Sequence, residues 1–513
     1  MMGRGTAAVL ALALLGSILA GPGCRRDDPK ALGFELLPSD EGPFVAIRLL
    51  VEVGSAFDPP GKEGLCRLAW SVLAGGGSRV RSAAEIAAAL APLGTEIRLD
   101  VGKEASAFSA TVRREDLDAL YAVLRETLLD PGFREGDFER LKAEQIDGLR
   151  ESLAGGRDER LAGDILGGMI HAGQPYGRAE AGTLVSAGSI TLDEVRDFYR
   201  EHFVRGNLTF GLAGSYPAGF PDRIRKDFLA LPASFTPRLV PQAPGRPRGI
   251  EAVLAERPAE TSAVILGVPI SATPDDDDFF ALWIAAAHLG EPGLASARMV
   301  QAMRDDRGLG RGGTAAAESF CPGLEGLSSP GLPLRFQYFT VRFHPVNDAA
   351  APFLVRWAVR ELGLMAEEGL TEERFVLIRE HLIHSLGLRG RSLGDRLARR
   401  MEARALGRAD LLDEAARILP RLSVGDIRAA VRKYLSPNAL FLAAVTKDAV
   451  AFRDALTAAT APPERPGNAG LDTSAEDEAV RAYPLLLRPD GVRIISAEEW
   501  IRAIDGRIAI QVQ

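Results

Sequence analysis

A long internal repeat constrains the fold of this 513-residue chain more than any other feature of its sequence. Residues 190–213 and residues 422–445 both read as a Thr- or Ser-capped amphipathic helix, a turn with Asn and an apolar strand, at an offset of about 231 residues. Residues 137–149 and residues 374–386 form a second pair of similar helices, at an offset of about 237 residues. A period this long is typical of a duplicated domain of about 200 residues, and it excludes a solenoid of short repeats.

The repeat predicts two homologous domains in tandem. We place the first domain at residues 35–240 and the second at residues 251–460. The stretch rich in Pro, Gly and Arg at residues 241–250 is the predicted linker, and residues 461–513 form a C-terminal tail.

Each predicted domain mixes strands with helices. Residues 44–54 alternate between apolar and other positions, and residues 95–101 with residues 107–112 read as a hairpin-like pair of strands. Two long helices are expected in the second domain, at residues 351–367 and 372–386. Strands and helices in clusters predict the α+β class, in which each domain is an antiparallel sheet with helices packed on one face.

The N-terminus has the pattern of an export signal. Arg4 is followed by an apolar run from Ala7 to Ala20, which is too short to span a bilayer. Because the run ends just before Cys24, residues 1–23 resemble a bacterial lipoprotein signal peptide, with Cys24 as the lipidated mature N-terminus. Ordinary cleavage that leaves Cys24 unmodified is the alternative. Either way we expect an exported, periplasm-facing protein, and under the first reading one anchored to a bacterial membrane, inner or outer.

Composition excludes several classes of function. The formal charge of −8 and the pI of about 5.6, without a basic stripe, give no reason to expect nucleic-acid binding. The three cysteines, Cys24, Cys66 and Cys321, cannot form a disulfide framework or a four-thiolate zinc site.

Four stretches, in a fixed order, carry a resemblance to a known family. They are Val51–Leu65, Gln174–Gly182, Asn207–Gly214 and Leu289–Leu309, the last with its glycines and arginines. Together with the two-fold repeat they resemble the pitrilysin/insulinase family of inverzincin metallopeptidases, over roughly residues 35–460. The resemblance implies two α+β domains that face each other around a chamber for unfolded peptides. It also implies partnering, since many members work as pairs of halves or subunits.

The resemblance places a zinc-binding helix directly after Gly64. In active members that helix carries His-x-x-Glu-His, in which two imidazoles one turn apart bind Zn²⁺ and the Glu activates its water. Aligned on Gly64, this chain has Arg67 and Ser71 at the histidine positions and Trp70 at the glutamate position. Arg has no lone pair for a metal and Trp is only a donor. We therefore expect these positions to be degenerate and assign no catalytic residue.

Two further family positions also differ from the active pattern. The third zinc ligand, a distal Glu in active members, falls near Asp147 or Gly148, with Glu144 one turn away. A tyrosine that follows the Gly-Leu pair of the second domain is replaced here by Arg311.

The remaining candidate sites have simpler structural explanations. His381 and His384 lie three apart on an expected helix after Glu380, and they are the remaining weak candidates for a metal. Cys66 next to Arg67 is better explained as a small buried side chain than as a reactive thiol.

Three short motifs fit turns or helix starts better than sites. Ser392 matches Gly-x-Ser-x-Gly, but a helix, not a strand, is expected before it. Residues 308–313 match a dinucleotide fingerprint without its strand, and Asp275–Asp278 read as a charged helix start more than as a Ca²⁺ loop.

These observations predict a noncatalytic peptidase-like subunit without a cofactor. It would bind unfolded peptides along a sheet edge, through residues not yet assigned, and would pair with an active zinc metallopeptidase of the same family. Three alternatives stay open: a zinc metalloendopeptidase that uses His381 and His384, a structural envelope protein, and a serine hydrolase acting through Ser392. Peptide preference and the partner's identity are not predicted.

Overall fold

The computed structural model describes nine stretches of the chain: residues 28–40, 42–154, 158–239, 242–291, 293–309, 312–318, 332–389, 391–458 and 473–502. The signal segment, Cys24, Arg311 and Cys321 lie outside the described residues, so the predictions about them stay predictions. Within the described stretches, no helix is both long and apolar enough to cross a membrane.

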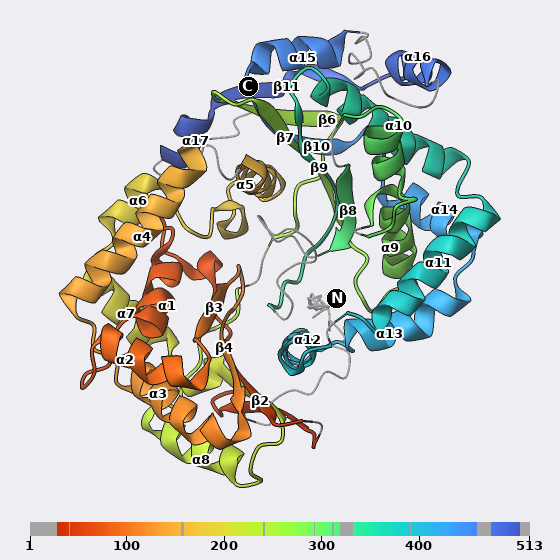
Figure 1. Ribbon diagram of the computed structural model, residues 1–513. Coiled ribbons are helices and arrows are strands. Elements are labelled where there is room, and N and C mark those ends of the chain that lie inside the picture. Colours follow the sequence, from red (N-terminus) through yellow and green to blue (C-terminus); the bar gives the residue numbers. More distant parts are fainter. Residues whose placement is uncertain are drawn as a thin grey trace, which may run out of the picture.

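The first half of the chain combines one sheet with eight α-helices among its described residues (Figure 1). Its strands are β1 Gly33–Pro38, β2 Phe44–Val51, β3 Arg98–Val101, β4 Ser106–Arg113 and β5 Leu208–Gly214. Its helices are α1 Leu65–Gly75, α2 Ala83–Leu90, α3 Leu117–Leu129, α4 Glu135–Ala154, α5 Asp158–Ile170, α6 Leu184–Ser189, α7 Leu192–His202 and α8 Phe220–Asp227.

The second half repeats this order of strands, with one α-helix instead of two between its second and third strands among the described residues, and continues beyond it. Its strands are β6 Ile250–Glu256, β7 Thr261–Ile270, β8 Gly313–Glu318, β9 Gln337–Asn347, β10 Leu440–Thr446 and β11 Leu487–Ser496. Its helices are α9 Asp277–Gly290, α10 Ala351–Glu367, α11 Glu372–Leu386, α12 Leu393–Leu406, α13 Leu411–Ile418, α14 Val424–Tyr434, α15 Ala449–Thr457, α16 Ser474–Ala482 and α17 Ala497–Arg502.

Strand order confirms the duplication. The first sheet runs β1-β5-β2-β4-β3, and the second runs β6-β10-β7-β9-β8 with β11 added outside β6. The two orders are the same when the strands of each half are numbered along the chain. The predicted α+β class, with two homologous tandem domains, is therefore correct.

The sheets are mixed, whereas the sequence predicted antiparallel ones. The pairs at the centre of each sheet are antiparallel, but β1 pairs parallel with β5, and β6 pairs parallel with both β10 and β11. A strand can return parallel to its neighbour only through a long crossover, and here most of each domain lies between β1 and β5 or between β6 and β10. Local alternation in the sequence does not carry that information.

Both faces of β2 are buried, although helices were predicted on one face only. Val45, Ile47 and Leu49 face the main core of the first half, with α1, α3 and α7. Ala46 and Leu50 point to the opposite face, where they pack against α12 of the second half. Strands that are buried on both faces read as near-continuous apolar runs, and β2 is apolar at every position except Arg48.

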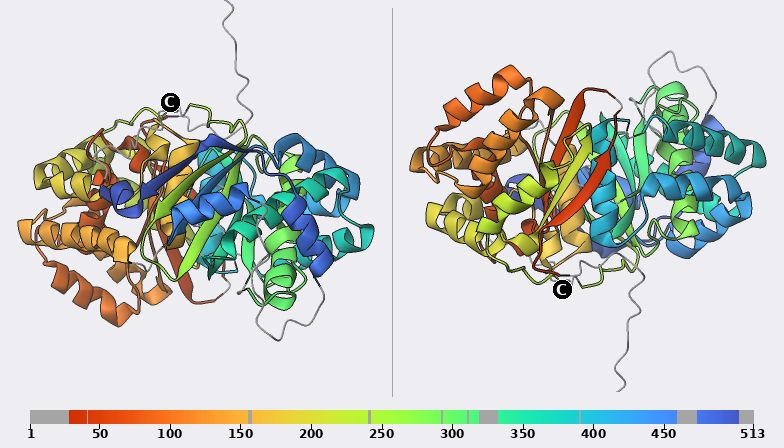
Figure 2. Two further views of the ribbon diagram at one scale, coloured as in Figure 1. Left: turned by 90° about the horizontal axis from the view of Figure 1, so that it is seen from above. Right: turned by 90° about the horizontal axis from the view of Figure 1, so that it is seen from below.

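The two halves exchange one helix each across their sheets. Helix α5 of the first half packs on β7 and β10, and α12 of the second half packs on β2 and β5 (Figure 1). A strand glycine makes room in each case, because a Cβ on Gly267 would lie 2.7 Å from Leu166 and one on Gly211 would lie 2.9 Å from Leu397. Figure 2 shows the two halves side by side, with α5 and α12 between the outer helical layers.

Hydrogen bonds and an ion pair add to this contact between the halves. Asp158 at the start of α5 accepts a hydrogen bond of 2.7 Å from Arg257, which follows β6. The backbone N–H of Arg335 donates to Glu104 at 2.8 Å. His171, after α5, is bonded to the hydroxyl of Tyr338 on β9. The halves therefore form one packed body around the region between α1, α4 and α5.

The segment predicted as a tail is partly built into the fold. Strand β11 pairs parallel with β6 at the edge of the second sheet, and α16 packs against α10. Helix α17 then reaches the first half, where it contacts α4 and α6 (Figure 1).

Candidate functional site

Helix α1 begins at a glycine that no other residue could replace without strain. Gly64 has φ of +95°, and a Cβ there would lie 2.5 Å from the carbonyl oxygen of Ala181. The carboxylate of Asp58 accepts the N–H groups of Gly64 at 2.8 Å and Cys66 at 2.7 Å, which satisfies donors at the start of the helix. Burial raises the pKa of Asp58 to about 7 despite these two hydrogen bonds.

Trp70 lies in the hydrophobic core of the first half. Its side chain is fully buried, and its ring centroid lies 5.5 Å from that of Phe198, 6.1 Å from Phe203 and 6.4 Å from Phe108. The position where the resemblance implies a general base is therefore occupied by an aromatic side chain that packs into the core.

Arg67 lies on a different face of α1 and lines a pocket of about 380 Å³. The three candidates for the distal ligand, Glu144, Asp147 and Gly148, line the same pocket from α4. The structure thus brings together the first ligand position and the distal one, as the alignment implies. Ser71 is half-buried one turn further along α1 and is not among the residues that line this pocket.

Further walls of the pocket come from segments that sequence reasoning did not assign to a site. Besides the residues named above, it is lined by Glu63, Gln145, Leu149, Glu151, Arg160, Leu161, Asp164, Gly177, Ala179, Ala181, Gly182, Thr183 and Trp500. Gly177 and Gly182 belong to the second family-like stretch. The local sequence around Asp164 or Trp500 does not predict that either residue lines this pocket. Both belong to helices whose packing depends on the other half of the chain.

Glu63 is the most deeply buried charge in this pocket wall. Its side chain is 2% exposed, Oε1 accepts the N–H of Gly61 at 3.0 Å, and the same oxygen lies 3.8 Å from Nε of Arg178. Oε2 is buried without a hydrogen-bond partner. On α5, burial raises the pKa of Asp164, while Arg160 acts in the opposite direction. Buried carboxylates therefore lie beside arginines where a metal centre would be expected.

The residues at the family's zinc positions do not fit zinc. The Arg67 guanidinium has no lone pair, Trp70 is packed into the core, and the hydroxyl of Ser71 is a poor substitute for imidazole. Across the described stretches of the chain, no three His, Cys, Asp or Glu side chains are grouped so as to hold a metal ion. We derive no catalytic step that depends on zinc.

His381 and His384 lie on α11, away from the pocket on α1. His384 is exposed, and its Nδ1 lies 2.7 Å from the carbonyl oxygen of Glu380 within the same helix. Neither histidine belongs to a metal-holding group within the described residues.

Two of the short motifs lie at helix starts as expected, whereas residues 308–313 lie partly outside the described residues. Ser392 caps α12 by accepting the N–H of Asp395, and α11 precedes it, so no strand leads into the serine. Asp276 caps α9. Cys66 is fully buried, its thiol lies 3.8 Å from the hydroxyl of Ser106, and burial raises its pKa well above the usual range. The thiol is therefore kept protonated.

Comparison with protein-family models finds two matches of one family. Residues 36–153 match the model described as Insulinase (Peptidase family M16), and residues 189–382 match the model described as Peptidase M16 inactive domain. Together the two matches cover more than half of the chain.

Several curated proteins are similar in sequence, and their names describe zinc proteases. An uncharacterized zinc protease of Streptomyces coelicolor is 28% identical over 306 residues, which are 58% of this chain and 62% of that protein. One from Mycobacterium tuberculosis is 23% identical over 369 residues, which are 69% of this chain and 78% of that protein. The chain thus spans about three fifths of the length of the Streptomyces relative.

Solved structures share the fold at low sequence identity. A peptidase M16 inactive domain from Pseudomonas fluorescens superposes with a TM-score of 0.70 and 18% identity, over 82% of this chain and 97% of that chain. A protease from Helicobacter pylori gives a TM-score of 0.70 and 14% identity, over 81% of this chain and 97% of that chain.

Proposed function

Because the chain belongs to the pitrilysin/insulinase family, peptidase family M16, we propose that it is a noncatalytic peptidase-like subunit that binds unfolded peptides. One observation carries this proposal. Helix α1 is intact, and Asp58 accepts N–H groups at its start. In the alignment, however, Arg67 and Ser71 stand at the metal-ligand positions, and Trp70 is packed into the core. The scaffold of the site is kept while its chemistry is replaced.

Peptide binding is supported by the edge of the first sheet. β3 is the outermost strand on its side of the sheet as far as the described strands extend, and it contacts α1, which carries Arg67 into the pocket. An extended peptide could pair with the free edge of β3 through backbone hydrogen bonds, and could place a side chain in the pocket. Such binding is sequence-tolerant, which suits unfolded substrates.

Pairing with an active zinc metallopeptidase of the same family follows from what the site lacks. A chain that binds peptides without cleaving them contributes to proteolysis only when a second subunit supplies the catalytic residues. We further propose that the mature protein is exported and held at a membrane by a lipid on Cys24, so the partner would face the same compartment.

The test is reconstitution with a motif-bearing partner. Tagged full-length protein is isolated from its own cell envelope in mild detergent, and co-purifying proteins that carry His-x-x-Glu-His are identified and produced separately. We expect the partner to cleave a labelled unfolded peptide at least several-fold faster in the presence of this chain. The pairing proposal is wrong if no metallopeptidase co-purifies and if family members from the same cell cleave at an unchanged rate after the chain is added.

A further inference from the structure

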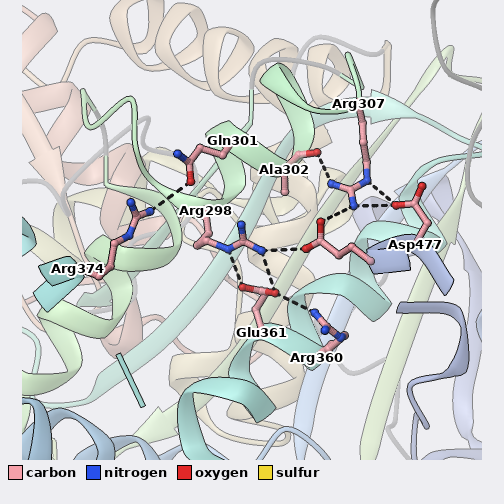
Figure 3. A network of polar contacts seen from close by, with 9 residues as sticks. Arg298, Gln301, Ala302, Arg307, Arg360, Glu361, Arg374 and Asp477 are labelled. Carbon is pink, nitrogen blue, oxygen red and sulfur yellow. Dashed lines mark hydrogen bonds and ion pairs between the residues drawn. The ribbon is translucent and has the colours of Figure 1, made fainter. Parts of the chain in front are cut away.

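The C-terminal segment ties the second half of the molecule to the pocket in the first half. It begins at α16, where Asp477 accepts hydrogen bonds from Nε and Nη2 of Arg307 at 2.9 and 2.7 Å (Figure 3). It continues as β11 along β6 and ends in α17, which contacts α4 and α6. The segment is therefore anchored at one end and presents a short helix to the first half at the other.

Trp500 on α17 sits over Gly168, a glycine in the last turn of α5. A Cβ on Gly168 would lie 2.6 and 3.1 Å from two atoms of the indole ring, so any other residue at this position would displace the ring. Glycine inside a helix costs about 1 kcal/mol relative to alanine, so its presence there calls for a packing reason. The missing side chain leaves a flat notch on α5 that accommodates an aromatic ring.

The indole ring of Trp500 contacts apolar side chains on one side and faces the pocket on the other. Trp500 packs against the cluster that includes Leu149 and Leu161 and lies between α5 and the second sheet. The same ring forms one wall of the pocket of about 380 Å³ that Arg67 and Asp164 line. Aromatic rings bury a large apolar area at low entropic cost, which makes them typical anchors in such notches.

We infer that the notch at Gly168 is a binding site for an aromatic side chain, and that Trp500 occupies it as an intramolecular ligand. A peptide with an exposed Trp, Phe or Tyr then competes with α17 for the notch. The competition is possible because α17 has only six residues, too few to be stable as a helix without its docking contacts. The competition with peptides rests on the proposed function, whereas the occupancy of the notch by Trp500 does not.

The first experiment tests the notch without reference to the proposed function. A fluorescent peptide with the sequence of residues 497–502, Ala-Glu-Glu-Trp-Ile-Arg, is titrated by anisotropy into the full-length wild type, Trp500→Ala and the control Leu486→Ala, an exposed apolar residue of the same segment. We expect Trp500→Ala to bind at least tenfold tighter than the other two, because its notch is vacated. The same peptide with Ala for Trp is expected not to bind. Equal or absent binding by all three proteins overturns the inference.

A second variant separates a blocked notch from a misfolded protein. Gly168→Val in the Trp500→Ala background fills the notch and is expected to abolish binding of the hexapeptide, while circular dichroism and the urea midpoint confirm a folded chain. Retained binding means that the ring docks elsewhere, which also overturns the inference.

A third titration uses an unfolded peptide with a single Trp. We expect Trp500→Ala to bind it several-fold tighter than the wild type, and expect this difference to vanish when the Trp of the peptide is replaced. If the hexapeptide binds Trp500→Ala but unfolded peptides bind neither protein, the notch is correct and the proposed function is wrong. If unfolded peptides bind both proteins equally, the peptide proposal stands and the competition with α17 is refuted.

Discussion

Position 70 shows at the scale of one residue why the site cannot be restored by simple back-substitution. The ring of Trp70 fills a space among Phe108, Phe198 and Phe203, so the core of the first half has been built around it. A glutamate there would leave a cavity and bring an unpaired carboxylate into an apolar environment. The identity of residue 70 and the packing of α1 are therefore coupled.

The sequence could point to Arg67, Trp70 and Ser71 because the motif has fixed spacing on one helix. Glu63 and Trp500, in contrast, were missed. The role of Glu63 depends on burial and on a missing partner for Oε2, and Trp500 reaches the pocket through a segment far away in sequence. Neither property leaves a trace in local periodicity.

Arg307 gives the first prediction at this scale. Its side chain is 2% exposed, pairs with Asp477 at 3% exposure, and also donates to Glu476 at 2.9 Å and to the carbonyl oxygen of Ala302 at 2.8 Å (Figure 3). Removing one partner of a buried ion pair leaves the other charge uncompensated, so Arg307→Ala should lower the free energy of unfolding by about 3–5 kcal/mol. Urea unfolding followed by circular dichroism measures it.

The matched control is Arg304→Ala. Arg304 lies one turn earlier and pairs with Asp305 at 2.8 Å, but it is exposed. Exposed pairs contribute little, so this variant should unfold like the wild type. Equal effects of the two substitutions would show that Arg307 does not anchor α16.

His171 gives a pH-dependent prediction. Burial, followed by nearby Lys103, lowers its pKa to about 4, whereas an unfolded chain protonates histidine near pH 6.5. The unfolded state therefore binds more protons between these values, and stability is lost as the pH falls from about 6.5 towards 4. His171→Gln should remove part of this decline, up to roughly 3 kcal/mol.

Urea midpoints measured at several pH values between 7.5 and 4.5 test this prediction, with the exposed His384→Gln as the control. Burial also lowers the pKa of His288, to about 3. The His171→Gln variant should therefore still lose some stability as the pH falls. An unchanged pH profile for His171→Gln would be inconsistent with a buried neutral imidazole.

At the scale of elements, much of the structure follows from local pattern. The expected helices at residues 351–367 and 372–386 coincide with α10 and α11. The hairpin-like pair was correct too, since β3 pairs antiparallel with β4. Apolar periodicity and capping residues determine these elements, and both can be read from a short window of sequence.

The exchange of α5 and α12 between the sheets could not be predicted in the same way. An apolar stripe shows that a helix is buried, but it does not say which sheet covers it. Gly267 and Gly211, which make room for the exchanged helices, look in sequence like ordinary glycines in apolar runs.

Gly267 provides the prediction at this scale. Gly267→Val places a branched side chain against Leu166 of α5 and should cost about 1–3 kcal/mol, although valine itself favours strands. Adding Leu166→Ala should partly relieve the clash, so that the double variant loses less stability than the sum of the single variants.

Thermal and urea unfolding measure these effects, with Gly136→Ala on α4 as the control, because a Cβ there meets nothing within 4 Å. If the effects of Gly267→Val and Leu166→Ala simply add, the packing of α5 on β7 is not as described.

At the scale of the whole molecule, the two halves resemble each other in topology but differ in what they carry. The first half contains α1 with Arg67, Trp70 and Ser71. The second half contributes α12 and the ion-pair network around Arg298 and Arg307 (Figure 3). It also contributes the segment that brings Trp500 to the pocket. The duplication and the family were accessible from sequence. The resemblance also implied that the halves face each other, but it did not say that α5 and α12 join them, because those contacts are between residues far apart in the chain.

The central claim is that this scaffold no longer carries peptidase chemistry of its own. The most direct measurement is the zinc content of the mature protein purified alone, together with cleavage of a quenched fluorescent peptide library by the same sample. Our account predicts far less than one zinc per chain and no cleavage, while the labelled peptides still bind. One zinc per chain, with cleavage that stops when a chelator is added, would contradict it.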